Sequence, residues 1–358
     1  MPIDLFSPWR LGHHGLPSRI VMSPMTRNRA PGNVPNDLMA AYYGQRAGAG
    51  LIITEGTSPS PNGLGYLRIP GIFSAEQVAG WRKVTTAVHG KGGRIFVQLM
   101  HTGRISHPDN LPAGAEVLAP SAVAAKEEMW TDTRGKQPLP EPRAMSDADI
   151  RTAIDEYAGA ARNAIDAGFD GIELHGANGY LIDQFLNPGA NRRDDAYGGD
   201  LERRNRFAID VARATAAAIG AERIGMRLSP YGVFNDVAIH DEIDAQYTSL
   251  ASSLSGVGLA HLHLVDHSGM GAPKPAPSTV RAIRERFKGS LILSGGYDRP
   301  RAEADLTEGR GDLIAFGRPF LANPDLPERL RRNAPLTAPD FATFYTPGEK
   351  GYTDYPFG

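Results

Sequence analysis

The feature that most constrains the fold of this chain is a repeat of short, nearly continuous apolar segments, each followed by a helical pattern. Eight such segments are predicted as strands: Arg19–Met22, Leu51–Glu55, Arg94–Leu99, Gly171–Leu174, Arg223–Leu228, Ala260–Val265, Leu291–Ser294 and Leu313–Phe316. Strands that are apolar on both faces belong to parallel sheets covered by helices. Eight strand-helix units therefore predict an α/β fold whose sheet closes into a TIM (β/α)8 barrel.

Helix-start signals between these segments support the alternation. Asp37 is predicted to cap a helix over Leu38–Arg46, and Ser74 to cap one over Ala75–His89. The remaining predicted helices are Asp147–Ala167, Leu201–Ile219, Asp241–Leu254, Val280–Phe287 and Arg301–Thr307.

The chain is longer than the barrel requires, because 358 residues exceed the length of about 250 typical of this fold. The first twenty residues predict a turn-rich lead-in or a small N-terminal hairpin. Residues 104–144, after the third strand, are rich in Pro, Gly and charge without a sustained period, which predicts an inserted lid or excursion. We expect one domain over residues 1–358, with a C-terminal tail over residues 334–358.

Composition narrows the classes of partner. The net charge is -2, from 38 basic and 40 acidic side chains, so neither a nucleic-acid surface nor a polybasic membrane patch is expected. The absence of cysteine excludes disulfides, thiolate metal sites and a cysteine nucleophile. No signal segment or membrane span is evident, and we expect a cytoplasmic protein that acts on small molecules.

Barrel active sites lie at the carboxyl ends of the strands, and chemistry-bearing residues collect there in this sequence. The fourth strand delivers His175, Asn178 and Tyr180 within six residues. An imidazole, an amide and a phenol presented together indicate a catalytic site. The alternative is that His175 and Asn178 only satisfy backbone groups at a strand-to-helix turn.

Other strand ends suggest a bound anion and a planar ring. Glycines after the seventh and eighth strands can bring backbone N–H groups onto a phosphate, and Arg318 adds a guanidinium. The alternative is two ordinary turns with a solvated Arg318. Arg227 lies in an apolar run, where a buried guanidinium requires a carboxylate or the electron-rich edge of a reduced cofactor. Gln98 and Thr26 are donors suited to the carbonyl and ring nitrogens of a heterocycle.

A metal-dependent hydrolase is the rival reading from the residues. His261 and His263 lie on one face of the sixth predicted strand, with His267 nearby, as in some metal-dependent barrels. Strand-end carboxylates at complementary positions are missing, so we expect no metal site. No GxGxxG or Walker-type loop is present, which disfavours a Rossmann or P-loop nucleotide site.

The chain resembles the Old Yellow Enzyme family of flavin-dependent ene-reductases nearly from end to end. The segments that carry the resemblance are SPMTRNRA from Ser23, QLMHTGR from Gln98, IELHGANGYLIDQFLNP from Ile172, NRRDDAYGGDLERRNRF from Asn191, RIGMRLSP from Arg223, AFGRPFLANPDL from Ala315 and GYTDYP from Gly351. Seven such segments in the right order make the match specific.

The resemblance implies a barrel that binds FMN non-covalently at the carboxyl ends of its strands. By the same resemblance, Arg227 faces the N1/O2 edge of the flavin and Thr26 lies near O4. The residues expected to line the isoalloxazine ring are Pro24, Met25, Thr26, Gly56 and Gln98. Those expected to hold the phosphate are Gly295, Gly296, Gly317 and Arg318.

The implied reaction is NAD(P)H-driven reduction of the C=C bond of α,β-unsaturated carbonyl or nitro compounds. His175 and Asn178 would bind the substrate oxygen, as an oxyanion hole does. Hydride would pass from flavin N5 to the β-carbon, and Tyr180 would protonate the α-carbon. NADPH or NADH would first reduce the flavin. The alternative within flavin barrels is a dienoyl-thioester reductase or an amine oxidase; a non-catalytic flavin-binding barrel is a further alternative.

Several positions depart from the pattern of many members. Met100 stands where tryptophan is common, which leaves the stereochemical outcome open, and Asn178 stands where others carry histidine. Thr26, in place of a cysteine, indicates the subgroup usually found as monomers, so we expect a monomer or weak dimer. Tyr66 and Tyr352 resemble residues that line the substrate pocket.

Overall fold

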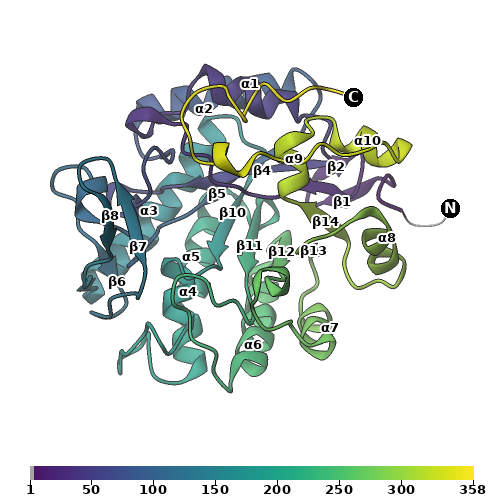
Figure 1. The fold of residues 1–358 in the computed structure, drawn as a ribbon. Helices are drawn as coiled ribbons and strands as arrows, with labels where there is room; N and C mark the ends of the chain where they lie inside the picture. Colours follow the sequence, from purple (N-terminus) through teal and green to yellow (C-terminus); the bar gives the residue numbers. More distant parts are fainter. Residues whose placement is uncertain (1–3) are drawn as a thin grey trace.

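The structure, a computed structural model, describes residues 4–358 and has a closed barrel of eight parallel strands at its centre (Figure 1). Neighbouring strands follow chain order around the barrel, and the last pairs with the first. The strands are β3 (Ile20–Met22), β4 (Leu51–Thr57), β5 (Ile95–Leu99), β10 (Gly171–Gly176), β11 (Ile224–Leu228), β12 (His261–Val265), β13 (Ser290–Ser294) and β14 (Leu313–Phe316). The predicted TIM barrel is confirmed, and all eight predicted strands are present.

Helices cover the outside of the barrel (Figure 1). They are α1 (Asp37–Gln45), α2 (Ala75–His89), α3 (Asp147–Asp166), α4 (Leu181–Leu186), α5 (Leu201–Ile219), α6 (Ile243–Val257), α7 (Pro277–Arg286), α8 (Arg299–Thr307), α9 (Arg318–Ala322) and α10 (Leu326–Arg332). Ser74 caps α2 as predicted, but the predicted cap of α1 is wrong by one residue: the side chain of Asn36, not Asp37, accepts from the N–H of Met39. Within residues 4–358, no helix has the length and apolar character needed to cross a membrane.

A short hairpin closes the amino-terminal end of the barrel. It consists of β1 (Trp9–Leu11) and β2 (His14–Leu16), and Leu11 and Leu16 pack against apolar side chains of the barrel interior. The indole N–H of Trp9 donates to Ser290 Oγ at 2.9 Å, at the start of β13. The hairpin confirms the small hairpin predicted for the first twenty residues. Residues 1–3 of that segment lie outside the described residues. The opposite end of the barrel remains for the site.

The sequence of residues 104–144 predicts a segment without regular structure, and that part of the prediction is wrong. The segment contains β6 (Leu118–Ala119), β7 (Glu128–Thr131), β8 (Gly135–Pro138) and β9 (Arg143–Ala144). Strands β7 and β8 form an antiparallel hairpin, and β6 pairs with β9. Exposed and buried residues alternate along β7, but four residues are too short a run for the period of two to be recognised.

A polar network crosses the interior of the barrel around Glu173 of β10. The Glu173 carboxylate accepts from Gln98 Nε2 at 2.8 Å and lies within 3.2 Å of nitrogens of His261 and His263. Burial raises the pKa of Glu173, but the two imidazoles lower it below its ordinary value, so the group is a carboxylate. The two histidines of the metal alternative thus serve this carboxylate, and residues 4–358 contain no His, Asp or Glu cluster able to hold a metal ion.

Candidate active site

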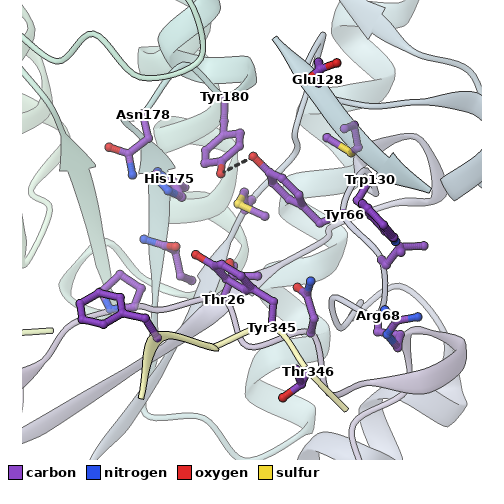
Figure 2. Close-up of a pocket in the computed structure, with 18 of the residues that line it drawn as sticks. Thr26, Tyr66, Arg68, Glu128, Trp130, His175, Asn178, Tyr180, Tyr345 and Thr346 are labelled. Atoms are coloured by element: carbon purple, nitrogen blue, oxygen red, sulfur yellow. Dashed lines mark hydrogen bonds between the residues drawn. The ribbon is translucent and has the colours of Figure 1, made fainter. Parts of the chain in front are cut away.

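The carboxyl ends of the barrel strands surround a cavity of about 690 Å³, called here the larger cavity (Figure 2). The sequence-predicted residues that line it are Pro24, Thr26, Gly56, Tyr66, Gln98, Met100, His175, Asn178, Tyr180 and Arg227. They come from β3, β4, β5, β10 and β11 or from the segments that follow these strands, so the barrel brings together residues as far apart in the sequence as Pro24 and Arg227.

The turn after β10 presents its side chains to the larger cavity because its backbone groups are bonded elsewhere. Asn178 adopts the left-handed conformation (φ 62°), and its N–H donates to Ser229 Oγ at 2.9 Å. Its carbonyl accepts from Asn235 Nδ2 at 2.7 Å. His175 Nδ1 and Asn178 Oδ1 are buried and have no hydrogen-bond partner among the described residues. These side chains therefore do not serve the turn, which argues against the structural alternative for them.

Tyr180 is the N-cap residue of α4 and lies beside His175, with ring centroids 4.9 Å apart and planes at 74°. The Tyr180 hydroxyl donates to the Tyr66 hydroxyl at 3.1 Å (Figure 2). Burial raises the pKa of Tyr180 and lowers the pKa of His175 well below its ordinary value. At neutral pH the site therefore presents a protonated phenol and a neutral imidazole.

Arg227 of β11 stands next to His175 in the barrel register and is only 8% exposed. Its Nε is buried without a hydrogen-bond partner among the described residues. Burial lowers the pKa of Arg227 while the charge of Glu173 raises it, and the group keeps its positive charge at neutral pH. A buried guanidinium with unused donor capacity favours an anionic or electron-rich ligand.

A smaller cavity of about 380 Å³ adjoins the larger one and shares Pro24 and Arg227 with it. Its lining includes the remaining predicted cofactor residues, Met25, Gly295, Gly296, Gly317 and Arg318. Gly295 has φ 131°, and a Cβ there would lie 2.3 Å from the carbonyl oxygen of Asp266. Only glycine fits this close approach, which brings backbone from two strand ends to one small cavity.

The two cavities together fit FMN. Glycine at position 56 leaves room for a tricyclic ring in the larger cavity. A Cβ there would lie 2.5 Å from Met100 Sδ, so any other residue would displace the Met100 side chain that lines the same cavity. Unused donor capacity on Arg227 faces that space, and the glycines and Arg318 of the smaller cavity suit a phosphate.

The predicted pocket residue Tyr352 does not line either cavity, and this prediction is corrected. Its ring is completely buried and stacks on Tyr42 with centroids 3.9 Å apart. The guanidinium of Arg29 lies 4.5 Å from its ring centroid. Tyr352 is therefore held by aromatic and cation-π contacts behind the cavity wall.

The outer wall of the larger cavity was missed from the sequence. It comprises a hairpin part, with Trp130 and Lys136, and a tail part, with Phe341, Tyr345 and Thr346. Figure 2 shows Trp130, Tyr345 and Thr346 at this wall. Arg68 adds a cation at the rim, paired with Asp132 at 2.6 Å, and Lys136 pairs with Glu128 at 3.4 Å. The aromatic residues of the tail were a visible signal, but nothing in their spacing placed them at the barrel mouth.

Comparisons with known proteins agree with this geometry. Residues 4–337 match the model of the NADH:flavin oxidoreductase / NADH oxidase family. The chain is 43% identical to a probable flavin mononucleotide-dependent alkene reductase of Leishmania infantum, over 99% of this chain and 97% of that protein. It is 41% identical to 12-oxophytodienoate reductase 1 of Oryza sativa subsp. japonica, over 99% of this chain and 93% of that one.

Solved structures agree as well. Morphinone reductase superposes with a TM-score of 0.96 at 45% identity, over 100% of this chain and 97% of that chain. An Old Yellow Enzyme homologue from Zymomonas mobilis has a TM-score of 0.94 at 43% identity, with 99% of each chain covered. Morphinone reductase is also known in complex with tetrahydroNAD.

These matches confirm the predicted Old Yellow Enzyme relationship, FMN as cofactor, a nicotinamide nucleotide as reductant, and flavin-dependent ene-reductase activity. The fold, the two cavities and the sequence matches lead to one conclusion: the chain belongs to the NADH:flavin oxidoreductase / NADH oxidase family.

Proposed function

We propose that the larger cavity binds an activated alkene, an α,β-unsaturated carbonyl or nitro compound, with its oxygen between His175 and Asn178. One observation carries this assignment. A polar atom of each side chain, His175 Nδ1 and Asn178 Oδ1, is buried without a hydrogen-bond partner among the described residues, although the backbone N–H and carbonyl of Asn178 are both bonded. The donors that would stabilise negative charge developing on the substrate oxygen are an imidazole N–H of His175 and the Nδ2 amide of Asn178.

Tyr180 is the proposed proton donor to the α-carbon. Its raised pKa keeps the phenol protonated at neutral pH, as a general acid requires. Its hydroxyl is 3.1 Å from that of Tyr66. After the proton has left Tyr180, the Tyr66 hydroxyl can turn and donate to the phenolate, which lowers the cost of the transfer.

FMN, when bound, supplies the hydride for the β-carbon. The residues proposed to hold its ring are Pro24, Met25, Thr26, Gly56, Gln98 and Arg227, and those proposed to hold its phosphate are Gly295, Gly296, Gly317 and Arg318. The hydrogen bond from Gln98 to Glu173 fixes the orientation of its amide, and the charge of Arg227 favours electron density on a ring beside it.

The remaining assignments concern the whole protein. We propose a monomer or weak dimer in the cytoplasm, with residues 1–358 as one domain and residues 104–144 as an inserted lid. Both NADPH and NADH serve as reductant. The ion pairs of Arg68 with Asp132 and of Lys136 with Glu128 support this, because both rim cations are already neutralised and neither favours the additional phosphate of NADPH.

The test separates cofactor, reductant and substrate. The purified protein is expected to be yellow, and denaturation should release FMN. Either nicotinamide nucleotide should bleach the flavin without oxygen, and a cyclic enone added afterwards should restore its colour. A colourless protein that FMN cannot reconstitute contradicts the cofactor assignment. A flavin that is bleached but not restored by enones or nitroalkenes contradicts the substrate assignment.

A further inference from the structure

Two buried arginines, Arg27 and Arg29, hold the C-terminal tail against the barrel, and most of their hydrogen bonds are made to backbone carbonyls. Arg29 donates to the carbonyl oxygens of Phe344, Gly348, Thr343 and Lys350 at 2.9–3.0 Å. Arg27 donates to the carbonyl oxygens of Phe344 and Gly351 at 3.1 and 2.6 Å. Among the ion pairs of residues 4–358, none involves either arginine, so the tail carbonyls are their principal acceptors.

The segment that carries these arginines also lines the larger cavity. Thr26 and Asn28 face the cavity, whereas Arg27 and Arg29 between and after them reach the tail. This stretch is not a regular strand, because Asn28 adopts the left-handed conformation (φ 55°), but its side chains still touch both the cavity and the tail. Because this stretch lines the cavity, a shift of the tail relative to it would change the shape of the cavity.

The clamped part of the tail contributes side chains to the cavity. Tyr345 and Thr346 line it, and their neighbours Phe344 and Thr343 give the carbonyls that Arg29 and Arg27 hold. Tyr345 is 60% exposed, and its side chain makes no hydrogen bond to the described residues. Its position at the cavity is therefore set by the backbone, and the backbone is set by the arginines. In Figure 2 its ring lies across the cavity from Tyr180 and Asn178.

From these contacts we propose that Arg29 is a positioning residue for substrate selection: it fixes the tail so that Tyr345 and Thr346 form the wall opposite His175, Asn178 and Tyr180. This inference rests on the proposed function and adds to it a device that sets which alkenes fit. Arg29 reaches no reacting atom itself. The planar guanidinium of Arg29 makes four hydrogen bonds to carbonyls of the tail at the same time. The single ammonium group of a lysine cannot reproduce that geometry.

The experiment compares Arg29→Lys with a matched control, Arg329→Lys, in the full-length holoenzyme. Arg329 is also buried and also donates to tail carbonyls, those of Pro335 and Pro356, but the residues it touches do not line either cavity. The measurements are kcat and KM for a small cyclic enone and for a bulky aryl enone, with the rate of flavin reduction by NADH. Arg29→Lys should change the KM ratio of the two enones about 5-fold or more and leave flavin reduction within about 2-fold. Arg329→Lys should leave both unchanged.

A double-mutant cycle tests the route of the effect. If Arg29 acts through Tyr345, Arg29→Lys should have little further effect on the KM ratio in a Tyr345→Ala background. Trypsin should also cleave after the exposed Lys350 faster in Arg29→Lys than in the unaltered protein. Additive effects of the two substitutions would overturn the proposed route through Tyr345.

A gentler variant covers the case in which Arg29→Lys does not fold. Gly348 is exposed, has φ 80°, and offers its carbonyl to Arg29. Gly348→Ala strains that turn from outside the core and should shift the KM ratio in the same direction. An unchanged KM ratio in a variant whose tail is cleaved faster would refute the proposal. Equal changes in Arg29→Lys and Arg329→Lys would refute it too, while loss of FMN or of all alkene reduction in the unaltered protein would instead refute the proposed function.

Discussion

The larger cavity has two walls of different construction. The inner wall is built on strand ends, where His175, Gln98 and Arg227 are buried and their positions follow from barrel register. The outer wall is built on the β7–β8 hairpin and the tail, where Trp130 and Tyr345 are each 60% exposed. The register of the paired strands in a closed barrel fixes the positions of their side chains. The positions of side chains on exposed loops depend instead on a few contacts. Chemistry is thus expected from the inner wall and selection of substrates from the outer wall.

The largest expected effect is at Tyr180. Tyr180→Phe keeps the ring but removes the acidic proton, so alkene reduction should fall by about 10²–10⁴-fold. Flavin reduction by NADH, which needs no such proton, should stay within about 2-fold. Stopped-flow measurement of the two half-reactions separates these rates. If both half-reactions slow equally, Tyr180 is not the proton donor, and the assignment of the chemistry to the inner wall is contradicted.

Glu55 of β4 is buried beside the Arg27 backbone, and its titration gives a prediction about stability. Burial raises its pKa to about 7, although the Arg27 N–H and charge and the Tyr43 hydroxyl oppose this. Because the folded pKa is raised, the stabilisation is fully present below the unfolded value near 4.5 and is lost as pH rises through about 7. The loss reaches up to ~3 kcal/mol at pH 8, since each pKa unit corresponds to about 1.4 kcal/mol.

Glu55→Gln should remove this dependence, so its stability relative to the unaltered protein should rise between pH 5 and pH 8. Denaturant unfolding at several pH values measures the difference. A difference that is constant with pH would show that Glu55 is already ionised in the folded protein at pH 5.

The role of His175 in the inner wall can be tested by ligand binding without turnover. Phenols mimic an enolate oxygen, and His175→Ala should weaken phenol binding by about 10–100-fold, the loss of one strong hydrogen bond to a charged oxygen. Absorbance titration of the oxidised holoenzyme measures the dissociation constant. Trp130→Ala, on the outer wall, is the control and should change it by less than about 3-fold. Similar losses in both variants would remove the distinction between the walls.

The smallest expected effect concerns charge on the outer wall. Glu128 neutralises Lys136 at the rim of the larger cavity. Glu128→Gln leaves that ammonium unpaired, which should raise kcat/KM for NADPH relative to NADH by about 2–5-fold at low salt, because NADPH carries an additional phosphate. The advantage should shrink as salt increases. An unchanged ratio would show that the adenosine end of the reductant does not approach the hairpin.

The difference between the walls also explains what could be predicted from the sequence. The inner wall was predictable because apolar periodicity locates strand ends, and strand ends in a closed barrel meet at one rim. His175, Asn178 and Tyr180 followed directly. The tail was not predictable from its own residues, since Arg29 binds backbone carbonyls and every residue type carries one. Tyr352 was assigned to the pocket from the family resemblance, but it is completely buried and packs against Tyr42 and Arg29 instead.

Gly225, the second residue of β11, shows how closely the side chains of the barrel interior pack. A Cβ at this position would lie 2.0 Å from the imidazole of His261, so the ring occupies the space that any other side chain would need. His261 in turn contacts Glu173, and Glu173 holds the amide of Gln98 at the active site. An engineer who replaces one of these strands with that of a relative must therefore transplant its neighbours as a set, since a misfit deep in the barrel is transmitted to the face where alkenes are reduced.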